Sequence, residues 1–379
     1  MDIKVVSTKF NIVVDADIPF IEGVLEPFCS VKYLKGEHID NTIVHNADAL
    51  IIRTRTKCDS SLLDNSRVKA IFSATIGCDH IDTLYCNRAG ISIYNAAGCN
   101  SQGVVQYVIT SLIAIAQREG LESLPKSIGI VGAGSVGERL AALTLELGFN
   151  VFRCDPPKKE NLLKGISNPS FGDYRLTVED YYDLDTTLKS CGIISLHVPL
   201  DKTTDNMCST AFFSNMVNGT IFINSSRGEV VDDVALIRDR GSLGPVILDV
   251  WRDEPNIKSE VLKISNIATP HIAGYSLEGK INATLFTLRN FASHYSIERL
   301  YDYSIPLPSS SEIPFVKNNK ISSIDNAAAL LLSSFPIWDE DRALRESPYL
   351  FEQIRLNYRY RRELTVRTKE ILKELLNNR

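Results

Sequence analysis

The sequence predicts an α/β protein with two doubly wound, Rossmann-like parallel-sheet domains and a charged helical region after them. Short runs rich in β-branched residues alternate with amphipathic segments of helical length through residues 1–295. This alternation is typical of parallel strands joined by helical crossovers. Because the alternation restarts after one long apolar segment at 104–117, we expect two sheet units rather than one continuous sheet.

Size and charge agree with this prediction. The 379 residues suggest two or three domains, and a hydrophobic share of 44% is enough for full-sized cores. A formal net charge of −5 gives no electrostatic basis for wrapping nucleic acid or docking on an anionic membrane. We therefore expect a small-molecule ligand and no nucleic-acid or membrane partner.

The eight cysteines are scattered, without a Cys-x-x-Cys pair or histidines at zinc-finger spacing. This pattern favours reduced thiols and no metal site. The N-terminal MDIKVVSTKF carries charge where a signal peptide has an apolar core, and the longest apolar stretch, 104–116, contains Gln106, Thr110 and Ser111. That stretch is too short to span a membrane, so we expect a cytoplasmic protein.

The strands of the first unit are expected at 5–15, 49–53, 70–74 and 91–94. Asn100 and Ser101 then provide a helix cap before 104–117, whose apolar positions form a wide buried stripe. We interpret this helix as a connector between the two domains.

The strands of the second unit are compact runs bounded by turn residues. We expect them at 127–131, 151–154, 193–197, 220–224, 246–250 and 267–269. From about Ser296 the pattern breaks, and the Pro/Ser-rich stretch PLPSSSEIP at 306–314 predicts a linker. Beyond it, an apolar helical stripe is formed by Leu364, Ile371, Leu372, Leu375 and Leu376.

The segment IVGAGSVG places a G-x-G-x-x-G motif directly after a predicted strand and at the start of a helix. Gly132 permits the tight turn, Gly134 lets the backbone approach a pyrophosphate, and Gly137 lets the helix pack closely on the strand. Backbone N–H groups at the helix start, including those of Ser135 and Val136, then face the phosphates. An ordinary glycine turn is the alternative.

Asp155 ends the next predicted strand, close to the offset of about 20 residues at which an acid hydrogen-bonds the adenine ribose. Its charge repels a 2′-phosphate, and the following Pro156 and Pro157 add no cation. We therefore predict NAD rather than NADP as the cofactor. The alternative for Asp155 is a solvated turn residue.

Three polar residues follow strands of the second unit, where ligands of open parallel sheets bind. Arg227 follows TIFIN, Glu254 follows VILDVW, and His271 follows NIATP. Each has a structural alternative when taken alone: a turn cation, an exposed loop acid and a loop histidine. Together they supply the groups needed for one reaction, the oxidation of a 2-hydroxy acid.

That reaction removes the hydroxyl proton while carbon 2 passes a hydride to the nicotinamide. A histidine suits the role of base, and a carboxylate bonded to its ring fixes the tautomer and stabilises the imidazolium. The planar fork of an arginine can hold the substrate carboxylate through two hydrogen bonds. We assign these roles to His271, Glu254 and Arg227, and expect Asp249 to lie beside the nicotinamide.

The segments GIVGAGSVG, CDPP, LHVPL, INSSRGEVVDD, LDVWRDEP and TPHIAG, in this order, resemble the D-isomer-specific 2-hydroxyacid dehydrogenases over residues 45–290. The resemblance implies that Arg227, Glu254 and His271 are the catalytic set. Val198 replaces a hydroxyl residue of many relatives, so its contact would come from the backbone. The resemblance also implies that Asp155, Val198, Asp249 and Gly274 contact NAD.

The resemblance also implies a discontinuous domain arrangement. Residues 1–100 and 276–295 would form the substrate-binding domain, and 101–275 the NAD-binding Rossmann domain. DEDRALRES and NYRYRRE resemble a group within the family that carries an appended C-terminal region. Residues 296–379 would then be an α+β dimerisation domain, and the protein a homodimer.

SATIGCDHID, NAAGCNSQGVVQYV and HIAGYSLEGK resemble the same group, whose substrate is a small phosphorylated 2-hydroxy acid. This implies substrate contacts at Thr54, Thr75 and Tyr275, besides Arg227. Another D-2-hydroxyacid dehydrogenase, for example one acting on 3-phosphoglycerate, and an NAD-sensing scaffold like the corepressors that share this fold are the alternatives.

A phosphorylated substrate needs a second anion site. The segment IIRTRTK offers Arg53, Arg55 and Lys57, which would share one face if the strand continued through them. A charged solvent face is the alternative to phosphate recognition.

Overall fold

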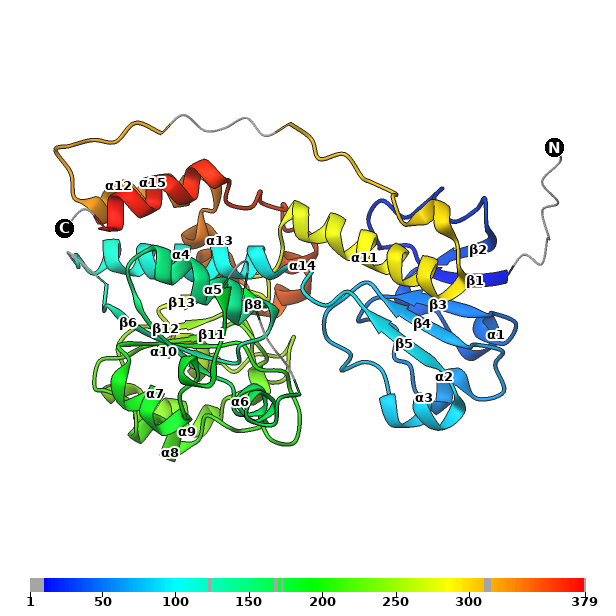
Figure 1. Ribbon diagram of the computed structural model, residues 1–379, viewed down its shortest axis with the longest axis horizontal. Helices are drawn as coiled ribbons and strands as arrows, with labels where there is room; N and C mark the ends of the chain where they lie inside the picture. The colour runs from blue at the N-terminus through cyan, green and yellow to red at the C-terminus, as the bar shows by residue number, and fades with distance from the viewer. Residues whose placement is uncertain (1–9, 122–123, 167–169, 172–173, 310–314, 378–379) are drawn as a thin grey trace. The chain divides into compact units, whose positions relative to one another are not determined.

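The structure, a computed structural model, describes residues 10–121, 124–166, 170–171, 174–309 and 315–377. The chain divides into two compact units (Figure 1). The first unit comprises Met1–Asn100 and Glu278–Ser309, and the second comprises Ser101–Leu277 and Ser310–Arg379. Residues 5–9 of the first predicted strand, and 310–314 of the predicted linker, lie outside the described residues.

The first unit is a five-stranded parallel sheet with the strand order β2-β1-β3-β4-β5. Helix α11 covers one face of it, where Phe72 and Phe291 pack with ring centroids 5.3 Å apart, and α1, α2 and α3 cover the other (Figure 1). Coverage of both faces explains why β3 and β4 are buried along their whole length. The sequence analysis missed β2. The elements are β1 (Phe10–Asp15), β2 (Cys29–Leu34), η1 (Gly36–His38), α1 (Asn41–Val44), β3 (Ala49–Ile52), α2 (Ser60–Leu63), β4 (Ala70–Ser73), α3 (Thr83–Ala89), β5 (Ser92–Asn95), α11 (Leu277–Tyr295) and η5 (Glu298–Leu300).

The second unit is a six-stranded parallel sheet with the order β13-β12-β11-β10-β6-β7. Helices α4 and α5 lie on one face, and α7, α8, α9 and α10 lie on the other (Figure 1). The two parallel sheets agree with the predicted fold class. The elements are α4 (Ser101–Arg118), β6 (Ser127–Val131), α5 (Ser135–Glu146), β7 (Asn150–Cys154), α6 (Pro156–Leu163), β8 (Ser170–Phe171), β9 (Tyr174–Arg175), η2 (Val178–Asp180), α7 (Leu184–Ser190), β10 (Ile193–Leu196), α8 (Thr210–Ser214), β11 (Ile221–Asn224), η3 (Gly228–Val230), α9 (Asp233–Asp239), η4 (Arg240–Ser242), β12 (Val246–Leu248), α10 (Ser259–Ile264) and β13 (Ile267–Ala268).

Helix α4, interpreted from the sequence as a connector, belongs to the core of the second unit. It is buried around its whole circumference from Gly103 to Ala116. It packs between α5 and α12 in the same core as the sheet residues of β6, β10 and β11. Most of the buried positions of α4 are apolar, and such a helix is stable when other elements enclose it.

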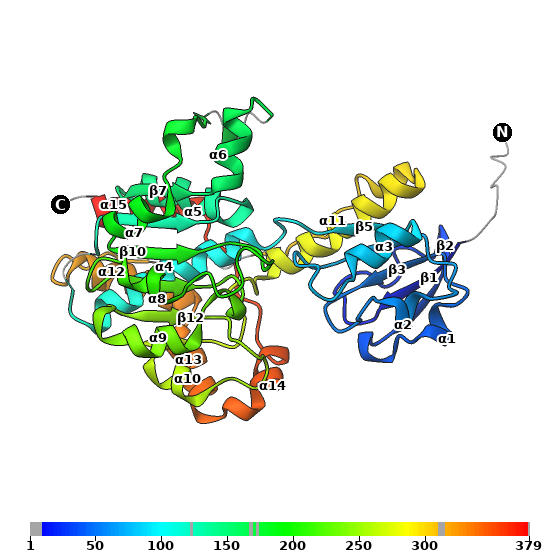
Figure 2. The same cartoon turned by 90° about the horizontal axis from the view of Figure 1, so that it is seen from below.

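The C-terminal region is α12 (Ser323–Ser334), α13 (Ile337–Glu346), η6 (Pro348–Leu350), α14 (Phe351–Leu356) and α15 (Val366–Asn377). The predicted α+β domain at 296–379 differs from this, since the described part of 315–377 holds no strand and one β-bridge, Ser276 with Arg361. Leu372 and Leu375 of the predicted stripe are buried in the core shared with α4. Because this stripe completes the core of the second unit, the region has no separate core. Figure 2 shows α13 and α14 side by side.

Within the described ranges, no helix is both long enough and apolar enough to cross a bilayer. No group of histidine, cysteine or acidic side chains among those residues is arranged to hold a metal ion. All eight cysteines are free thiols.

Candidate active site

The glycine motif forms the turn between β6 and α5. Gly132 has φ +93°, and a Cβ on it would lie 2.5 Å from the carbonyl oxygen of His197. A Cβ on Gly137 would lie 2.1 Å from the carbonyl oxygen of Gly132, whereas a Cβ on Gly134 would meet nothing within 4 Å. The fold therefore requires the outer two glycines, and the open space at Gly134 fits the approach of a dinucleotide pyrophosphate.

Asp155 is fixed beside this turn. It caps α6, and its carboxylate accepts hydrogen bonds from the N–H of Ala133 at 2.9 Å and of Lys158 at 3.0 Å. The Lys158 ammonium donates to the Ala133 carbonyl and lies 3.7 Å from Glu138 Oε1. Pro156 and Pro157 themselves add no cation, but the first turn of α6 brings the next residue, Lys158, back to the glycine turn.

Val198 and Gly274, two further predicted cofactor positions, lie in the second unit and make their contacts there through backbone atoms. The backbone nitrogen of Val198 is 2.8 Å from where a Cβ on Gly132 would lie, so this residue lines the glycine turn through its main chain. The Gly274 carbonyl is 3.4 Å from where a Cβ on Gly103 would lie, which places Gly274 against the start of α4.

Asp249 organises the loop after β13. Its Oδ1 accepts from the hydroxyl of Thr269 at 2.7 Å and the N–H of Ile272 at 2.8 Å, and its Oδ2 accepts from the N–H of Ala273 at 2.8 Å. Its carbonyl accepts from the N–H of His271 at 2.7 Å. Burial raises the pKa of this carboxyl more than the nearby His271 and the hydrogen bonds lower it. Asp249 thus sets the position of His271 from within the protein.

His271 and Glu254 form a direct pair, with 2.8 Å between Nδ1 and Oε2. A carboxylate can only accept a hydrogen bond, so Nδ1 carries the proton and Nε2 keeps the lone pair that can act as a base. Burial pushes the pKa of Glu254 upward, but His271, the Trp251 N–H and Arg355 outweigh it, so the pKa is below its usual value. Glu254 is therefore an anion at neutral pH, as its predicted role requires.

Arg227 follows β11, and its guanidinium donates to the Ser226 carbonyl at 2.7 Å. The Asn224 side chain holds this turn by donating to the Arg227 carbonyl at 2.8 Å and accepting from the Ser226 N–H at 3.0 Å. Because β11, β12 and β13 are adjacent and parallel, Arg227, Glu254 and His271 all follow the carboxyl ends of neighbouring strands.

Gly228 lets the Arg227 loop touch the loop that carries Glu254. A Cβ on Gly228 would lie 1.9 Å from the carbonyl carbon of Trp251, so a side chain there would separate the two loops. The sequence analysis assigned no role to this glycine, because its neighbour is distant in sequence.

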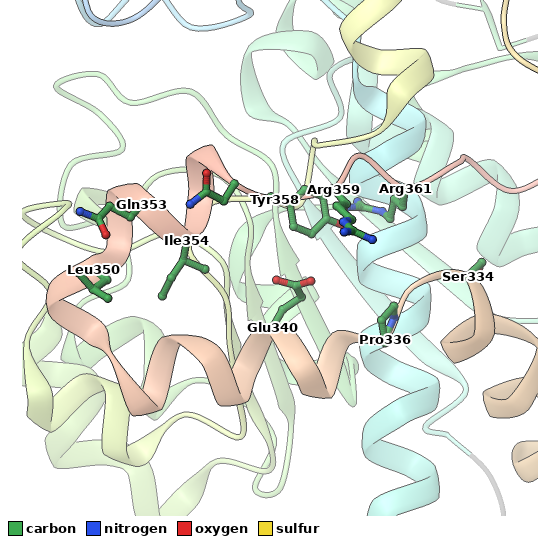
Figure 3. A pocket seen from close by; sticks show the side chains of 10 residues that line it. Ser334, Pro336, Glu340, Leu350, Gln353, Ile354, Tyr358, Arg359 and Arg361 are labelled. Carbon is green, nitrogen blue, oxygen red and sulfur yellow. The ribbon is translucent and has the colours of Figure 1, made fainter.

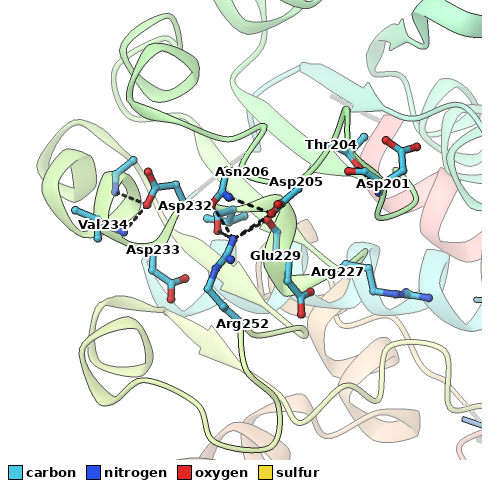
Figure 4. A network of polar contacts seen from close by, with 12 residues as sticks. Asp201, Thr204, Asp205, Asn206, Arg227, Glu229, Asp232, Asp233, Val234 and Arg252 are labelled. Carbon is cyan, nitrogen blue, oxygen red and sulfur yellow. Dashed lines mark hydrogen bonds and ion pairs between the residues drawn. The ribbon is translucent and has the colours of Figure 1, made fainter. Parts of the chain in front are cut away.

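Arg252 ties the same loops together (Figure 4). It donates to the carbonyls of Glu229 at 2.7 Å and Val231 at 3.0 Å, and to Asn206 Oδ1 at 2.8 Å. The sequence analysis missed this residue although it lies inside the LDVWRDEP segment. Its partners come from two segments, one at 205–206 and one at 229–231, and sequence spacing does not reveal such a meeting.

Thr54 and Thr75 belong to the first unit and follow β3 and β4, which are adjacent and parallel. The hydroxyl of Thr75 is 2.6 Å from that of Ser73 and donates to the Gly77 carbonyl at 3.1 Å. Ser73 Oγ lies 3.3 Å from Nε2 of His80. The loop around Thr75 is therefore held by its own side chains.

The three cations after β3 do not share a strand face. The strand ends at Ile52, so Arg53, Arg55 and Lys57 lie in the turn that follows and the alternation of side chains does not extend to them. The expectation of a shared face is wrong for this reason. Arg53 donates to the Asp17 carbonyl at 3.0 Å, Arg55 lies 3.6 Å from Glu37, and Lys57 lies 2.8 Å from Asp59.

Tyr275, the third predicted substrate contact, lies in the second unit. Its ring packs edge-on against Tyr358 and Tyr360, with centroid distances of 6.1 and 6.2 Å. A cavity of about 590 Å³ lies in the C-terminal region near these rings (Figure 3). It is lined by Ser334, Pro336, Glu340, Leu350, Gln353, Ile354, Asn357, Tyr358, Arg359 and Arg361.

Comparison with known proteins gives one family match and many relatives. Residues 112–273 match the D-isomer specific 2-hydroxyacid dehydrogenase, NAD binding domain. An erythronate-4-phosphate dehydrogenase of Bacteroides fragilis is 40% identical over 93% of this chain and 97% of its own length. The enzyme of the same name from Bacteroides thetaiotaomicron is 38% identical over the same shares.

Solved structures show the same fold. A D-lactate dehydrogenase of Aquifex aeolicus, complexed with NAD and lactic acid, has a TM-score of 0.61 and 24% identity, covering 77% of this chain and 97% of that one. A cofactor-bound 3-phosphoglycerate dehydrogenase of Entamoeba histolytica has a TM-score of 0.62 and 25% identity over the same shares.

Proposed function

Because the chain belongs to the family of erythronate-4-phosphate dehydrogenases, within the D-isomer-specific 2-hydroxyacid dehydrogenases, we propose that it oxidises 4-phospho-D-erythronate at carbon 2 with NAD. The product is 2-oxo-3-hydroxy-4-phosphobutanoate, in the route to pyridoxal 5′-phosphate. The observation that carries this proposal is the hydrogen bond of 2.8 Å between His271 and Glu254. These residues follow β13 and β12, and β12 is the neighbour of β11, the strand that precedes Arg227.

The roles of the catalytic residues follow from their chemistry. Arg227 holds the C1 carboxylate of the substrate by two hydrogen bonds and so orients carbon 2. Nε2 of His271 takes the proton of the C2 hydroxyl, while Nδ1–H stays bonded to Glu254. The negative charge of Glu254 stabilises the imidazolium that results. As the C–H bond at carbon 2 breaks, its electron pair leaves with the hydride and the C=O bond forms.

NAD, when bound, supplies the hydride acceptor. The residues that would hold it are the turn at Gly132, Gly134 and Gly137, with the backbone of Ser135, Val136 and Val198, the acid Asp155, and the loop of Asp249 and Gly274. The open space at Gly134 beside two sterically enclosed glycines supports this assignment.

The first unit is then the substrate-binding domain, and Thr54, Thr75 and Tyr275 contact the substrate. The free thiols fit the reducing environment of the cytoplasm, which we propose as its location.

Two chains pair through the C-terminal region. Tyr349, Leu356 and Val366 support this pairing, since they are large apolar residues exposed by 81%, 53% and 74%. A molar mass of one chain in solution by light scattering would contradict it.

The decisive experiment measures formation of the 2-oxo product from 4-phospho-D-erythronate with NAD and a second 2-oxo acid, which accepts the hydride from NADH and regenerates NAD. We expect turnover with the wild-type chain and a loss of about 10²–10⁴-fold or more in His271→Ala, because the base is removed. NAD binding should persist in this variant. Near-normal turnover of His271→Ala would contradict the role of that residue.

The same assay separates the alternatives. Faster turnover of 3-phosphoglycerate would make the chain a different D-2-hydroxyacid dehydrogenase. NAD binding without exchange of hydride with any tested 2-oxo acid would favour an NAD-sensing scaffold.

A further inference from the structure

We propose that the C-terminal region is a positioning element of the active site, in which Arg361 fixes the loop that carries His271 and Arg355 supplies a cation beside Glu254. This inference rests on the proposed function and assigns the region a task within one chain, apart from any pairing of chains.

Arg361 is 5% exposed, and its guanidinium is surrounded by main-chain carbonyl oxygens. It stacks on Phe335, with 4.1 Å between the guanidinium carbon and the ring centroid. A rigid fork with several N–H donors can reach such a set of acceptors at once. Its acceptors are the carbonyls of Gly103 at 2.9 Å, Ile272 at 3.1 Å, Tyr275 at 3.3 Å and Ala273, and the hydroxyl of Tyr358 at 3.1 Å.

The loop after His271 is therefore held from two sides. Asp249 accepts the N–H groups of Ile272 and Ala273, and Arg361 donates to the carbonyls of the same two residues. His271 itself has φ +57°, a conformation that costs energy for a residue with a side chain and persists when its surroundings enforce it. Loss of either clamp would leave buried polar groups unsatisfied and let the loop relax.

The segment around Arg361 also runs alongside the next residues of the loop. The N–H of Leu277 donates to the Arg361 carbonyl at 2.9 Å, and the Ser276 hydroxyl donates to Glu363 at 2.7 Å. Together with the packing of Tyr358 on Tyr275, these contacts fix the predicted substrate residue through the same segment.

Arg355 acts on the other half of the catalytic pair. Its guanidinium lies 3.8 Å from Glu254 Oε2 and 3.0 Å from Glu352, and its side chain is 18% exposed. Within the described residues, His271 lies 2.8 Å and Arg355 lies 3.8 Å from Glu254, and Asp249 lies behind His271. Removal of the Arg355 cation would leave the charge of Glu254 less balanced, so the imidazolium form of His271 would be more stable.

The test compares Arg361→Met, Arg361→Lys, Arg355→Met and Arg355→Lys with the matched control Arg359→Met. Arg359 is an exposed arginine of the same segment. The measurements are kcat, KM, the pH dependence of kcat/KM, the melting temperature, and hydrogen exchange of peptides covering 269–277 and, for comparison, 127–146.

For Arg361→Met and Arg361→Lys we expect kcat to fall by about tenfold or more, because charge-assisted hydrogen bonds are lost. Exchange should accelerate in 269–277 and stay unchanged in 127–146. Lysine does not rescue, because one ammonium cannot reach carbonyls on several sides. For Arg355→Met we expect the acidic limb of kcat/KM to move to higher pH, and Arg355→Lys should restore it. Arg359→Met should match the wild type.

Folded Arg361 variants with kcat within twofold of the wild type and unaltered exchange in 269–277 would overturn the proposal. Equal acceleration in both peptides would also overturn it, because that is the result of general destabilisation. If the Arg361 variants do not fold, an unshifted pH profile of Arg355→Met overturns the proposal. Absence of wild-type turnover of 4-phospho-D-erythronate contradicts the proposed function instead, and the exchange measurement remains decisive for Arg361.

Discussion

At the scale of single residues, one hydrogen bond decides which ring nitrogen of His271 can take a proton. The bond of 2.8 Å from Nδ1 to Glu254 assigns that role to Nε2. Asp249 and Arg252 hold the surrounding loops largely through backbone groups: Asp249 accepts from the N–H groups of Ile272 and Ala273, and Arg252 donates to the carbonyls of Glu229 and Val231. Substitution of a site residue and substitution of a residue that holds it in place should therefore have different effects.

For Arg227→Lys we expect kcat/KM to fall by about 10–100-fold, mostly through a higher KM, because a point charge cannot make the paired hydrogen bonds of a guanidinium. Steady-state kinetics with 4-phospho-D-erythronate measures this change. Arg342→Lys, at an arginine that is 62% exposed and outside the site, is the control. Unchanged kcat and KM in Arg227→Lys would remove this residue from the substrate site.

Asp155→Asn separates the charge of this residue from its cap on α6. Asparagine caps helices as well as aspartate does, so the fold should be retained. We expect the preference for NAD over NADP to fall by about tenfold or more, because the repelling anion is gone while Lys158 remains. Adding Lys158→Met should abolish the gain for NADP but not the loss for NAD. An unaltered ratio of the two kcat/KM values would contradict the assigned role.

At the scale of elements, the β6–turn–α5 unit shows how one motif serves both fold and ligand. The first and third glycines are needed because neighbouring backbone occupies the space where a side chain would lie. The middle glycine has open space around it. The first and third glycines of the motif are therefore needed for the fold, and the second leaves space for a ligand to approach.

Gly134→Ala should leave the melting temperature within about 2 °C of the wild type, since nothing lies within 4 Å of the added Cβ. NAD binding, measured by fluorescence titration, should weaken clearly. Gly137→Ala should instead destabilise the unit by about 1–3 kcal/mol or prevent folding, because its Cβ would meet the Gly132 carbonyl. Equal NAD affinity of Gly134→Ala and the wild type would contradict the pyrophosphate site.

At the scale of the whole molecule, the C-terminal region and the second unit share one hydrophobic core. Both tryptophans, Trp251 and Trp338, lie in this unit, so intrinsic fluorescence reports its unfolding. We expect stability and activity to be coupled, because the region that completes the core also contacts Glu254 and the His271 loop.

The free energy of unfolding should depend on pH partly through the titration of His197. Burial lowers the pKa of this histidine to about 3, whereas in the unfolded chain the value is about 6.5. The unfolded state therefore binds an extra proton between these values. This contribution to stability is complete above about pH 6.5 and is lost as the pH falls toward 3, with a slope of up to about 1.4 kcal/mol per pH unit.

Urea unfolding followed by tryptophan fluorescence between pH 4.5 and 8 measures this slope. His197→Asn should show a flatter dependence than the wild type, and the difference between the two cancels the contributions of all other groups. Parallel curves would mean that His197 takes up a proton in the folded state.

The sequence by itself determined the strands of the two large sheets except β2, the order of these sheets along the chain, the glycine turn, and the residues after β11, β12 and β13. These features are local, because a β-branched run, a glycine spacing or a polar residue at a strand end can be recognised within a few positions of the sequence. The tertiary structure decided that α4 is core, that residues beyond 315 join the second unit, and that Arg252, Arg355 and Arg361 support the catalytic loops. Such contacts join residues up to 258 positions apart, as in the bond from Arg361 to Gly103, and they depend on how surfaces pack rather than on any local pattern.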